Sequence, residues 1–345
     1  MRRFLILLCL LGLVIAVPAR AEKGPENPPW LAEDQAMVLP GKDDLETDPK
    51  MAAAFGRAGK AYNQGSFGTA LKAWRQLARA GFGPALYNLG VMHEHGRGVP
   101  VDYAKAAKWY QQAAKNEVPG ALVNLARLHV EGRGVKRDPS EALQLLEQAS
   151  QLGSAPAQFN LGAAYLQGLG TKADPKEAAV WFEMAAEQGH APAAYNLGVL
   201  YQRGDTIERD LEEAQRYFAI AADAGDAFGH YALGNLLAHP NPDRPDPDMA
   251  KAVHHLDVAA RAGVALAQNR LGILLAKGEG IKRDRETALV WFHIAAGLGA
   301  ANAARNRDAL SASLSKPVRI RAKRRADAFR PTPAPIAPTA STENN

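Results

Sequence analysis

Hydrophobic landmarks recur along most of the chain at a constant interval. A leucine followed by a small residue returns every 36 residues, and once after 38, at Leu89-Gly90, Leu125-Ala126, Leu161-Gly162, Leu197-Gly198, Leu233-Gly234 and Leu271-Gly272. A bulky residue keeps the same register at Trp109, Leu145, Trp181, Tyr217, His255 and Trp291. A repeat of this length predicts a stack of helix pairs, in which no pair buries its apolar face alone.

Each unit is expected to hold a first helix around the Leu-Gly pair and a second helix that begins at an aspartate. These aspartates are Asp102, Asp138, Asp174, Asp210, Asp248 and Asp284. Aspartate is a good N-cap because its carboxylate accepts from unpaired first-turn N–H groups. Glutamates three residues later, Glu141, Glu177 and Glu213, predict capping boxes. The second helix is expected to end near a glycine such as Gly189, where one unit has Glu117 instead.

Glycine inside the first helix requires a packing reason, because it costs roughly 1 kcal/mol relative to alanine. We expect Gly90, Gly162 and Gly198 to let the two helices of a unit approach closely. The small partners predicted on the second helix are Ala106, Ala142, Ala178, Ala214, Ala252 and Ala288. The bulky landmark three residues later is then expected to insert toward neighbouring helices.

The segment from Ala157 to Gly189 follows the pattern A-x-x-x-L-G-x-x-Y-x-x-G-x-G-x-x-x-D-x-x-x-A-x-x-W-x-x-x-A-A-x-x-G and resembles the Sel1-like repeat. The resemblance covers residues 82–299. It implies an all-α, right-handed α/α solenoid of about six helix pairs, tetratricopeptide-like, that serves as a protein–protein interaction scaffold. Ala126 and His255 depart from the pattern, so their units are expected to be looser or to bend the stack.

The remaining segments have other compositions. Arg2 and Arg3, an apolar run of about 14 residues and a small-x-small motif ending at Ala21 predict a secretory signal peptide over 1–21. An uncleaved N-terminal anchor in the inner membrane is the alternative. We expect a flexible leader at 22–50, a tetratricopeptide-like helix pair at 51–81, capping helices at 300–330 with Ser315 as an N-cap, and a proline-rich disordered tail at 331–345.

Charge and cysteine content exclude several functions. The formal charge of +5 comes from the two ends of the chain, because residues 22–315 hold 31 basic and 34 acidic side chains. This distribution disfavours nucleic acid as a partner. The basic stretch at 316–330 is interpreted as a cap, with attachment to anionic lipid or glycan as the alternative. Cys9 lies in the predicted signal, so a processed chain would have no disulfide, zinc–thiolate site or thiol nucleophile.

The sequence predicts no catalytic residue, no metal site, no cofactor and no small-molecule substrate. His93 and His129 occupy an aromatic packing position, and His255 fills the bulky slot, so these histidines are interpreted as packing residues. Walker, G-x-S-x-G and H-E-x-x-H motifs do not occur in the sequence. The Gly-x-Gly loops follow a helix in every unit that has one, which indicates helix-to-helix turns rather than phosphate cradles.

One polar series suggests a binding site. Asn88, Asn124, Asn160 and Asn196 occupy one position in four successive units, just before the Leu-Gly pair, whereas later units have Ala232 and Arg270. An asparagine amide both donates and accepts, so a ladder of them could pair with the backbone of an extended peptide. Hydrogen bonds between adjacent units are the structural alternative.

These observations predict a non-enzymatic adaptor in the bacterial cell envelope, located in the periplasm, that binds a protein or peptide in its superhelical groove. The alternative is a structural or regulatory factor of cell-wall or exopolysaccharide assembly that engages glycan, which would require exposed aromatic side chains on the inner face. A hydrolase is disfavoured because the cysteines of some Sel1-like proteins are missing. The absence of glycosylation sequons disfavours a eukaryotic secretory protein.

Overall fold

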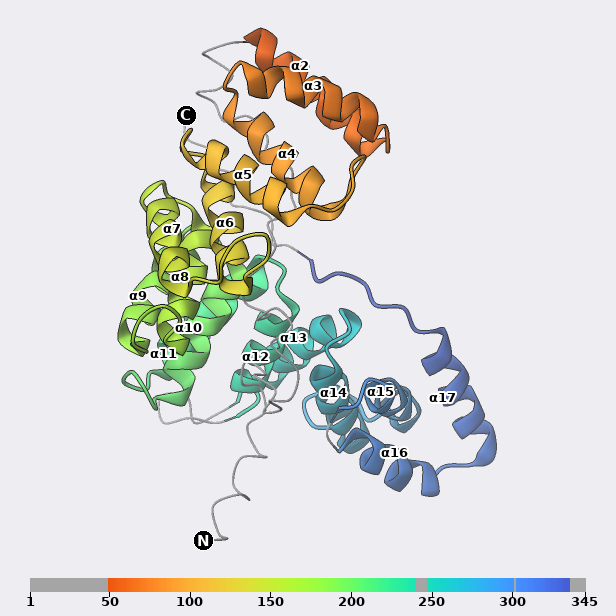
Figure 1. Ribbon diagram of the computed structural model, residues 1–345. Coiled ribbons are helices and arrows are strands. Elements are labelled where there is room, and N and C mark those ends of the chain that lie inside the picture. The colour runs from red at the N-terminus through yellow and green to blue at the C-terminus, as the bar shows by residue number, and fades with distance from the viewer. Residues whose placement is uncertain (1–48, 240–246, 301, 336–345) are drawn as a thin grey trace, which may run out of the picture.

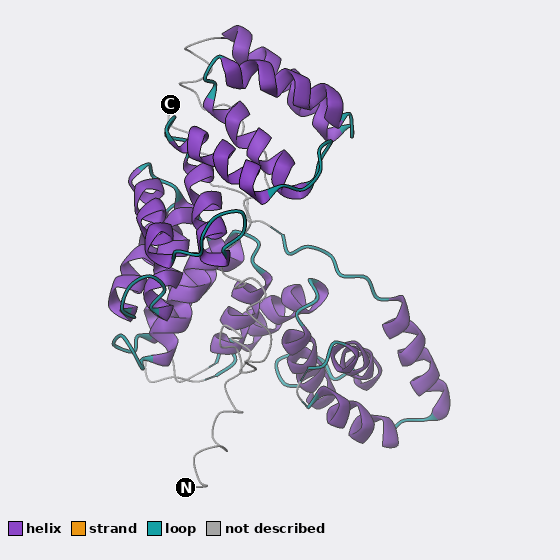
Figure 2. Ribbon diagram, viewed as in Figure 1, coloured by secondary structure: helices purple, strands orange, loops and turns teal. Residues whose placement is uncertain are grey.

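The computed structural model describes residues 49–239, 247–300 and 302–335. Over these residues the chain forms sixteen helices and no strand (Figure 2), which confirms the all-helical prediction. The predicted signal peptide, residues 22–48 of the leader and residues 336–345 of the tail lie outside the described residues.

Six helix pairs stack in succession, each with a first and a second helix (Figure 1). The first helices are α4 (Gly83–His95), α6 (Pro119–Glu131), α8 (Ala155–Gln167), α10 (Ala191–Arg203), α12 (Ala227–Leu237) and α14 (Ala265–Lys277). The second helices are α5 (Tyr103–Ala114), α7 (Pro139–Gln151), α9 (Pro175–Glu187), α11 (Leu211–Asp223), α13 (Met249–Arg261) and α15 (Arg285–Gly297). The array is preceded by α2 (Pro49–Asn63) and α3 (Phe67–Arg79) and followed by α16 (Ala303–Ala312) and α17 (Lys316–Ala328).

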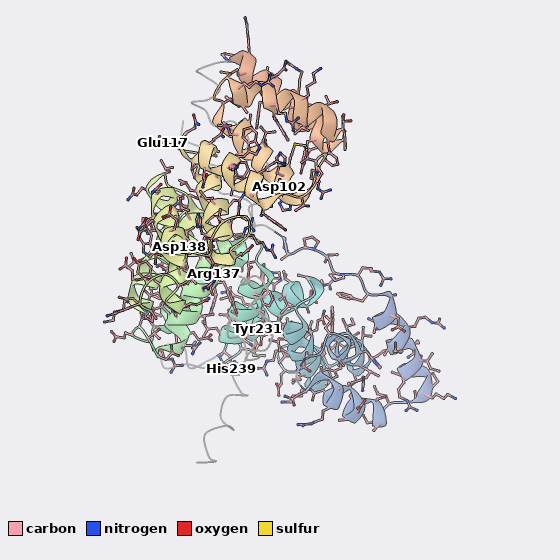
Figure 3. The ribbon with its side chains drawn as sticks, in the orientation of Figure 1. Asp102, Glu117, Arg137, Asp138, Tyr231 and His239 are labelled. Atoms are coloured by element: carbon pink, nitrogen blue, oxygen red, sulfur yellow. The ribbon has the colours of Figure 1, made fainter. Side chains whose placement is uncertain are left out.

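All six predicted aspartates cap their second helices. Each carboxylate accepts from a backbone N–H of the first turn, as when Lys105 donates to Asp102 Oδ1 over 2.9 Å (Figure 3 labels Asp102). The predicted capping boxes form only by half: each aspartate accepts from the N–H of the glutamate three residues later, but the aspartate N–H that the glutamate side chain would bind is already used. Asp138 donates its N–H to the carbonyl of His129 over 2.9 Å, which ties the loop to the preceding first helix.

The second helices end in the left-handed conformation that the glycine landmark predicts. Gly153 and Gly189 have φ of 79° and 80°. Glu117 adopts the same conformation with φ of 55°, although it has a side chain. A left-handed backbone costs a residue with a Cβ about 1–2 kcal/mol, so this turn is strained.

Glycines of the first helices allow the predicted close helix contact, and three of the bulky landmark residues, Leu145, Tyr217 and Trp291, are buried in the core as expected. The side chain that covers the glycine, however, is not the landmark residue. A Cβ built on Gly162 would lie 2.6 Å from Phe182 Cδ1, and one on Gly90 would lie 2.4 Å from Tyr110 Cε1. The ring over the glycine therefore belongs to the residue after the landmark, whereas Trp109 and Trp181 are only half-buried. This second series is Tyr110, Leu146, Phe182, Phe218, Leu256 and Phe292, and all of its members are buried.

The apolar core runs along the array instead of surrounding one centre. One cluster of buried residues extends from α4 to α11, and others lie at the two ends and around α12. At the C-terminal end α17 packs on α15, with Ala322 fully buried. Ser315 stands at the N-cap of α17, but its side chain makes no capping hydrogen bond. Among the described helices, none is both long and apolar enough for a membrane span.

Candidate partner-binding face of the first helices

The predicted asparagine series lies on four consecutive first helices, because a 36-residue repeat returns the same helix position in every unit. Three of its members, Asn88, Asn124 and Asn160, are buried, with exposed fractions of 1%, 2% and 0%. Asn196 on α10 is half-buried. The structure therefore buries three members of the series and leaves Asn196 on α10 the most accessible. Asn124 reaches Tyr87 of the preceding first helix, and we call this contact between successive first helices the seam.

Two of the buried amides have no hydrogen-bond partner among the residues that the structure describes. Neither the nitrogen nor the oxygen of Asn88 and Asn160 is paired. A buried polar group left unpaired costs about 1–3 kcal/mol, and such groups are rare in folded proteins. Packing alone would favour an apolar residue of the same size at these two positions.

The other two amides make local bonds. Asn124 Nδ2 donates to the hydroxyl of Tyr87 over 3.2 Å, which joins α6 to α4, while its oxygen is unpaired. Asn196 Nδ2 donates to the carbonyl of Pro192 in its own helix over 2.9 Å. The structural alternative of a bond between adjacent units therefore applies to Asn124, and the binding role of the series stays a prediction.

The same helix position has different occupants farther along. Arg270 on α14 is half-buried, its Nε is buried without a hydrogen bond, and it forms no ion pair within the described residues. Asn306 on α16 stands 36 residues after Arg270 and donates to Asn269 Oδ1 over 2.9 Å. The sequence analysis missed Asn306, although continuing the repeat interval beyond the last Leu-Gly pair would have found it.

A buried charged cluster between α4 and α6 was also missed. Arg127 binds Glu94 of the previous unit and approaches both oxygens of Glu131 at 3.5 Å. Tyr110 donates its hydroxyl to Glu94 Oε2 over 2.7 Å, and Arg133 lies 3.3 Å from Glu131. The sequence contained a sign of this cluster, because Arg127 occupies a position at which the neighbouring units have a small or β-branched apolar residue.

Burial and neighbouring charge set the protonation of this cluster. Burial raises the pKa of the Tyr110 hydroxyl well above its usual value, and the adjacent Glu94 carboxylate raises it further. Burial also raises the pKa of Glu131, against the opposite effect of Arg127. For Arg127 burial lowers the pKa, but the two carboxylates outweigh this and the pKa is raised. Arg127 is therefore held as a buried cation between two acids.

The histidines singled out in the sequence occupy packing positions. His93 is buried in α4, and burial lowers its pKa. His255 of α13 faces His230 of α12, with 2.9 Å between their Nδ1 atoms. The described residues contain no group of three histidine, cysteine or acidic side chains that could hold a metal ion.

The Gly-x-Gly loops act as turns that rest on the preceding unit. The second glycine of each loop packs against the start of the previous second helix, so that a Cβ on Gly134 would lie 2.2 Å from the carbonyl carbon of Tyr103. Gly170 is equally close to Pro139, where the distance to the carbonyl oxygen would be 2.3 Å. The glycines of these loops are therefore needed for close contacts between units of the stack.

Comparisons with known proteins agree with this architecture. The Sel1 repeat model matches residues 83–118, 119–154, 155–190, 191–226, 227–264 and 265–299. The crystal structure of a Sel1 repeat protein from Oxalobacter formigenes has 30% identity and a TM-score of 0.63, covering 71% of this chain and 99% of that one. The protective antigen c5321 of uropathogenic Escherichia coli, described as having an SLR fold, has 27% identity and a TM-score of 0.47, with coverage of 83% and 71%. No match was found among curated proteins.

The six matched segments coincide with the six helix pairs described above, and each begins at or next to the first residue of a first helix. The matches also span more than half of the chain. This protein belongs to the Sel1 repeat family.

Proposed function

We propose that the protein is a non-enzymatic adaptor of the cell envelope, which binds an extended segment of a partner protein along its first helices. The observation that carries the proposal is the pair of buried, unpaired amides of Asn88 and Asn160. An extended peptide presents one N–H and one C=O per residue, which are the groups that an asparagine amide binds. A bound segment would thus satisfy groups that the protein leaves unpaired.

Binding at these amides requires adjacent first helices to separate locally, because both side chains are almost completely buried. A solenoid allows such opening, since each unit contacts only its neighbours and stability is divided among the interfaces. Asn196 on the more open α10 is the natural entry point. In this scheme the partner inserts along the seam from α10 toward α4.

The envelope location rests on the predicted signal peptide, which lies outside the described residues. An anchor in the inner membrane would place the same solenoid on the same side of that membrane. Glycan is disfavoured as the ligand, because among the described residues Phe228 is the only aromatic side chain that is largely exposed, at 43%. Cell-wall or exopolysaccharide machinery would then be engaged through its proteins.

The proposal is tested by comparing stability with binding in asparagine variants. Replacing Asn88 and Asn160 by alanine removes unpaired buried groups, so the melting temperature is expected to stay or rise while partner binding falls. Asn124→Ala is the matched control, since it breaks the bond to Tyr87 and should lower stability by about 1 kcal/mol. Lower stability with unchanged binding in the double variant would contradict the proposal.

The partner itself is identified by photo-crosslinking in living cells. A photoreactive residue at Asn196 probes the first helices, and the same residue at Val180 serves as the control, because Val180 is 49% exposed on the second helix α9. One discrete protein captured from Asn196 and absent from Val180 is expected. Capture from both positions, or adducts with glycan alone, would refute a protein-binding face on the first helices.

A further inference from the structure

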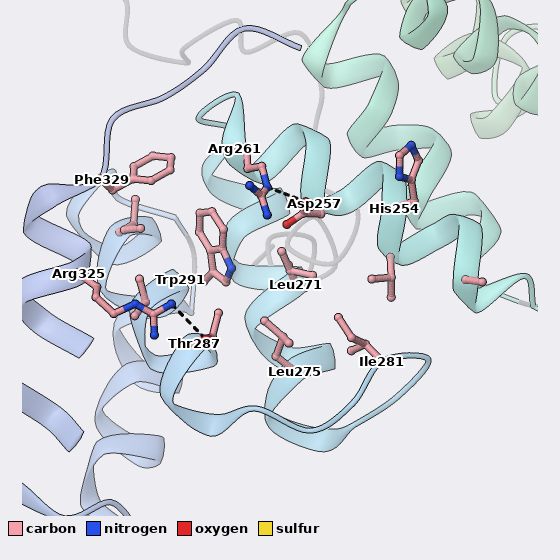
Figure 4. A pocket seen from close by; sticks show the side chains of 14 residues that line it. His254, Asp257, Arg261, Leu271, Leu275, Ile281, Thr287, Trp291, Arg325 and Phe329 are labelled. Atoms are coloured by element: carbon pink, nitrogen blue, oxygen red, sulfur yellow. Dashed lines mark hydrogen bonds and ion pairs between the residues drawn. The ribbon is translucent and has the colours of Figure 1, made fainter. Parts of the chain in front are cut away.

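A cavity of about 680 Å³ lies at the C-terminal end of the array, far from the asparagine series in sequence. Figure 4 shows its lining, which comes from the second helices α13 and α15, from α14 and the loop that follows it, and from α17 with Phe329 just after it. The residues that line it recur at helical spacing, as Val253, Asp257 and Arg261 do on α13. It is therefore a groove between two consecutive second helices that a further element encloses.

The element that encloses the groove is the segment after α17, residues 329–335, which we call the C-terminal arm. Phe329, just after α17, packs edge-on against Trp291 of α15, with 5.4 Å between the ring centroids. The backbone N–H of Thr332 then donates to the carbonyl of Arg261 over 2.9 Å. The arm is thus attached to both α15 and α13, and it forms a wall across the cavity. Residues 331–345 are predicted to be a disordered tail, but its described part, residues 331–335, is held to α13 by the hydrogen bond from Thr332 to Arg261.

The chemistry of the lining is divided between an aliphatic interior and a charged rim. The aliphatic side chains are Val253, Leu271, Leu275, Ile281, Val290 and Ile294. At the rim Arg261 binds Asp257 over 2.7 Å. Arg325 is held only loosely, by Thr287 at 3.3 Å and Glu286 at 3.7 Å (Figure 4 shows the contacts to Asp257 and Thr287).

The charge of the rim favours an anion. Two guanidinium groups line the cavity against the single carboxylate of Asp257. The nearby carboxylate of Glu286, 3.7 Å from Arg325, is bound more closely, at 2.6 Å, by Arg321, which lies outside the lining. Arg325 also belongs to a strongly basic helix, because residues 316–330 carry seven basic side chains and one acidic one. A guanidinium group offers several N–H donors in a fixed plane, which suits a carboxylate or phosphate group.

We propose that this cavity binds a single aliphatic chain that ends in an anionic head group. The chain would lie among the aliphatic side chains beside Trp291, where each buried methylene contributes about 0.8 kcal/mol. The head group would lie between Arg261 and Arg325 at the rim. A volume of about 680 Å³ is within the range of pockets that hold small ligands. The chemistry fits a free fatty acid and equally an acyl chain of an anionic phospholipid.

Dodecanoate is the probe, titrated below its micelle concentration into the purified full chain and followed by calorimetry. One molecule per chain is expected to bind. Arg325→Gln should weaken binding about tenfold, because a charge-assisted bond to the head group is lost. Arg319→Gln is the matched control, since Arg319 is exposed on the same helix and does not line the cavity, and it should leave binding unchanged. Dodecyltrimethylammonium has the same chain with a cationic head and should not bind.

Three outcomes would overturn the proposal: no saturable binding of dodecanoate, equal binding of the cationic detergent, or equal weakening by both arginine variants. Phe329→Ala tests the wall independently, because it removes the contact with Trp291 and should weaken dodecanoate binding while the circular dichroism spectrum is kept. Phosphatidylglycerol vesicles distinguish the two sources of the ligand. Vesicle binding that Arg325→Gln weakens assigns the site to a phospholipid, and dodecanoate binding without vesicle binding assigns it to a free fatty acid.

Discussion

Replacing Gly162 by alanine tests the helix contact on which every unit is built. The added Cβ would lie 2.6 Å from Phe182 Cδ1 and 3.1 Å from the carbonyl oxygen of Ala178. Alanine gains roughly 1 kcal/mol of helix propensity. Overpacking a tight contact costs about 1–3 kcal/mol, and here part of the obstruction is backbone that cannot rotate away. Because of this backbone obstruction we take the upper part of the range, about 2–3 kcal/mol, and expect a net destabilisation of about 1–2 kcal/mol.

The second unit of the array indicates which second substitution would compensate for Gly162→Ala. The second unit has Ala126 at the glycine position, and its counterpart of Phe182 is the smaller Leu146, with both residues buried. Phe182→Leu alone should destabilise by opening a cavity. Combined with Gly162→Ala it should restore most of the loss, with a coupling energy of about 1–2 kcal/mol between the two positions.

Urea unfolding followed by far-ultraviolet circular dichroism measures these effects, with midpoints compared at equal slope. Gly56→Ala is the control, because an added Cβ on Gly56 in α2 would meet no atom of the described residues within 4 Å beyond its own stretch of helix. This variant should stabilise the protein by up to about 1 kcal/mol. If Gly162→Ala stabilised the protein as Gly56→Ala does, or if the Gly162 and Phe182 variants were additive, the helix contact would not be the reason for the glycine.

Three further predictions concern single features of the stack. Glu117→Gly should stabilise the protein by about 1 kcal/mol in the same urea assay, since glycine relieves the left-handed turn, and an unchanged midpoint would contradict strain there. Burial, with His230 and other neighbouring charges, lowers the pKa of His255 to about 4, so the unfolded chain binds more protons than the folded one between pH 6.5 and 4. The melting temperature should therefore decrease as the pH is lowered from 6.5 to 4, and it should decrease less in His255→Leu. Glu94→Ala should cost about 3–5 kcal/mol, because buried Arg127 keeps only its longer 3.5 Å contact with Glu131 and Tyr110 loses its acceptor. Glu94→Leu combined with Arg127→Leu should cost less, as thermal unfolding would show.

The helices of the six pairs and the residues near which they end could be predicted from the sequence. Asp102 and Gly189 are local signals, because an N-cap and a left-handed C-terminal turn depend on residues within one turn of the helix. The interval of 36 residues then places every other element by repetition. This explains why the six helix pairs and their boundaries follow from the pattern alone.

The partners of side chains across helices were less predictable. The landmark Trp181 and the buried Phe182 are adjacent in sequence and both aromatic, so periodicity alone does not tell which one covers Gly162. The ion pair of Glu94 with Arg127 joins two consecutive units, and it becomes evident only once the units are stacked in three dimensions. The C-terminal cavity depends on where α17 turns back, which no local signal specifies.

The asparagine position itself shows what the scaffold does and does not require. If packing of the stack fixed that position, every unit would need a residue of similar size and polarity there. Instead the chain has Asn160 with both amide atoms unpaired, a buried alanine at 232, the larger and charged Arg270, and Asn306 bonded to its neighbour. The seam therefore accepts residues from alanine to arginine, and an apolar residue would avoid the cost of the unpaired amide. The fold therefore does not demand asparagine at 88 and 160, which supports the proposal that a partner segment pairs with these amides.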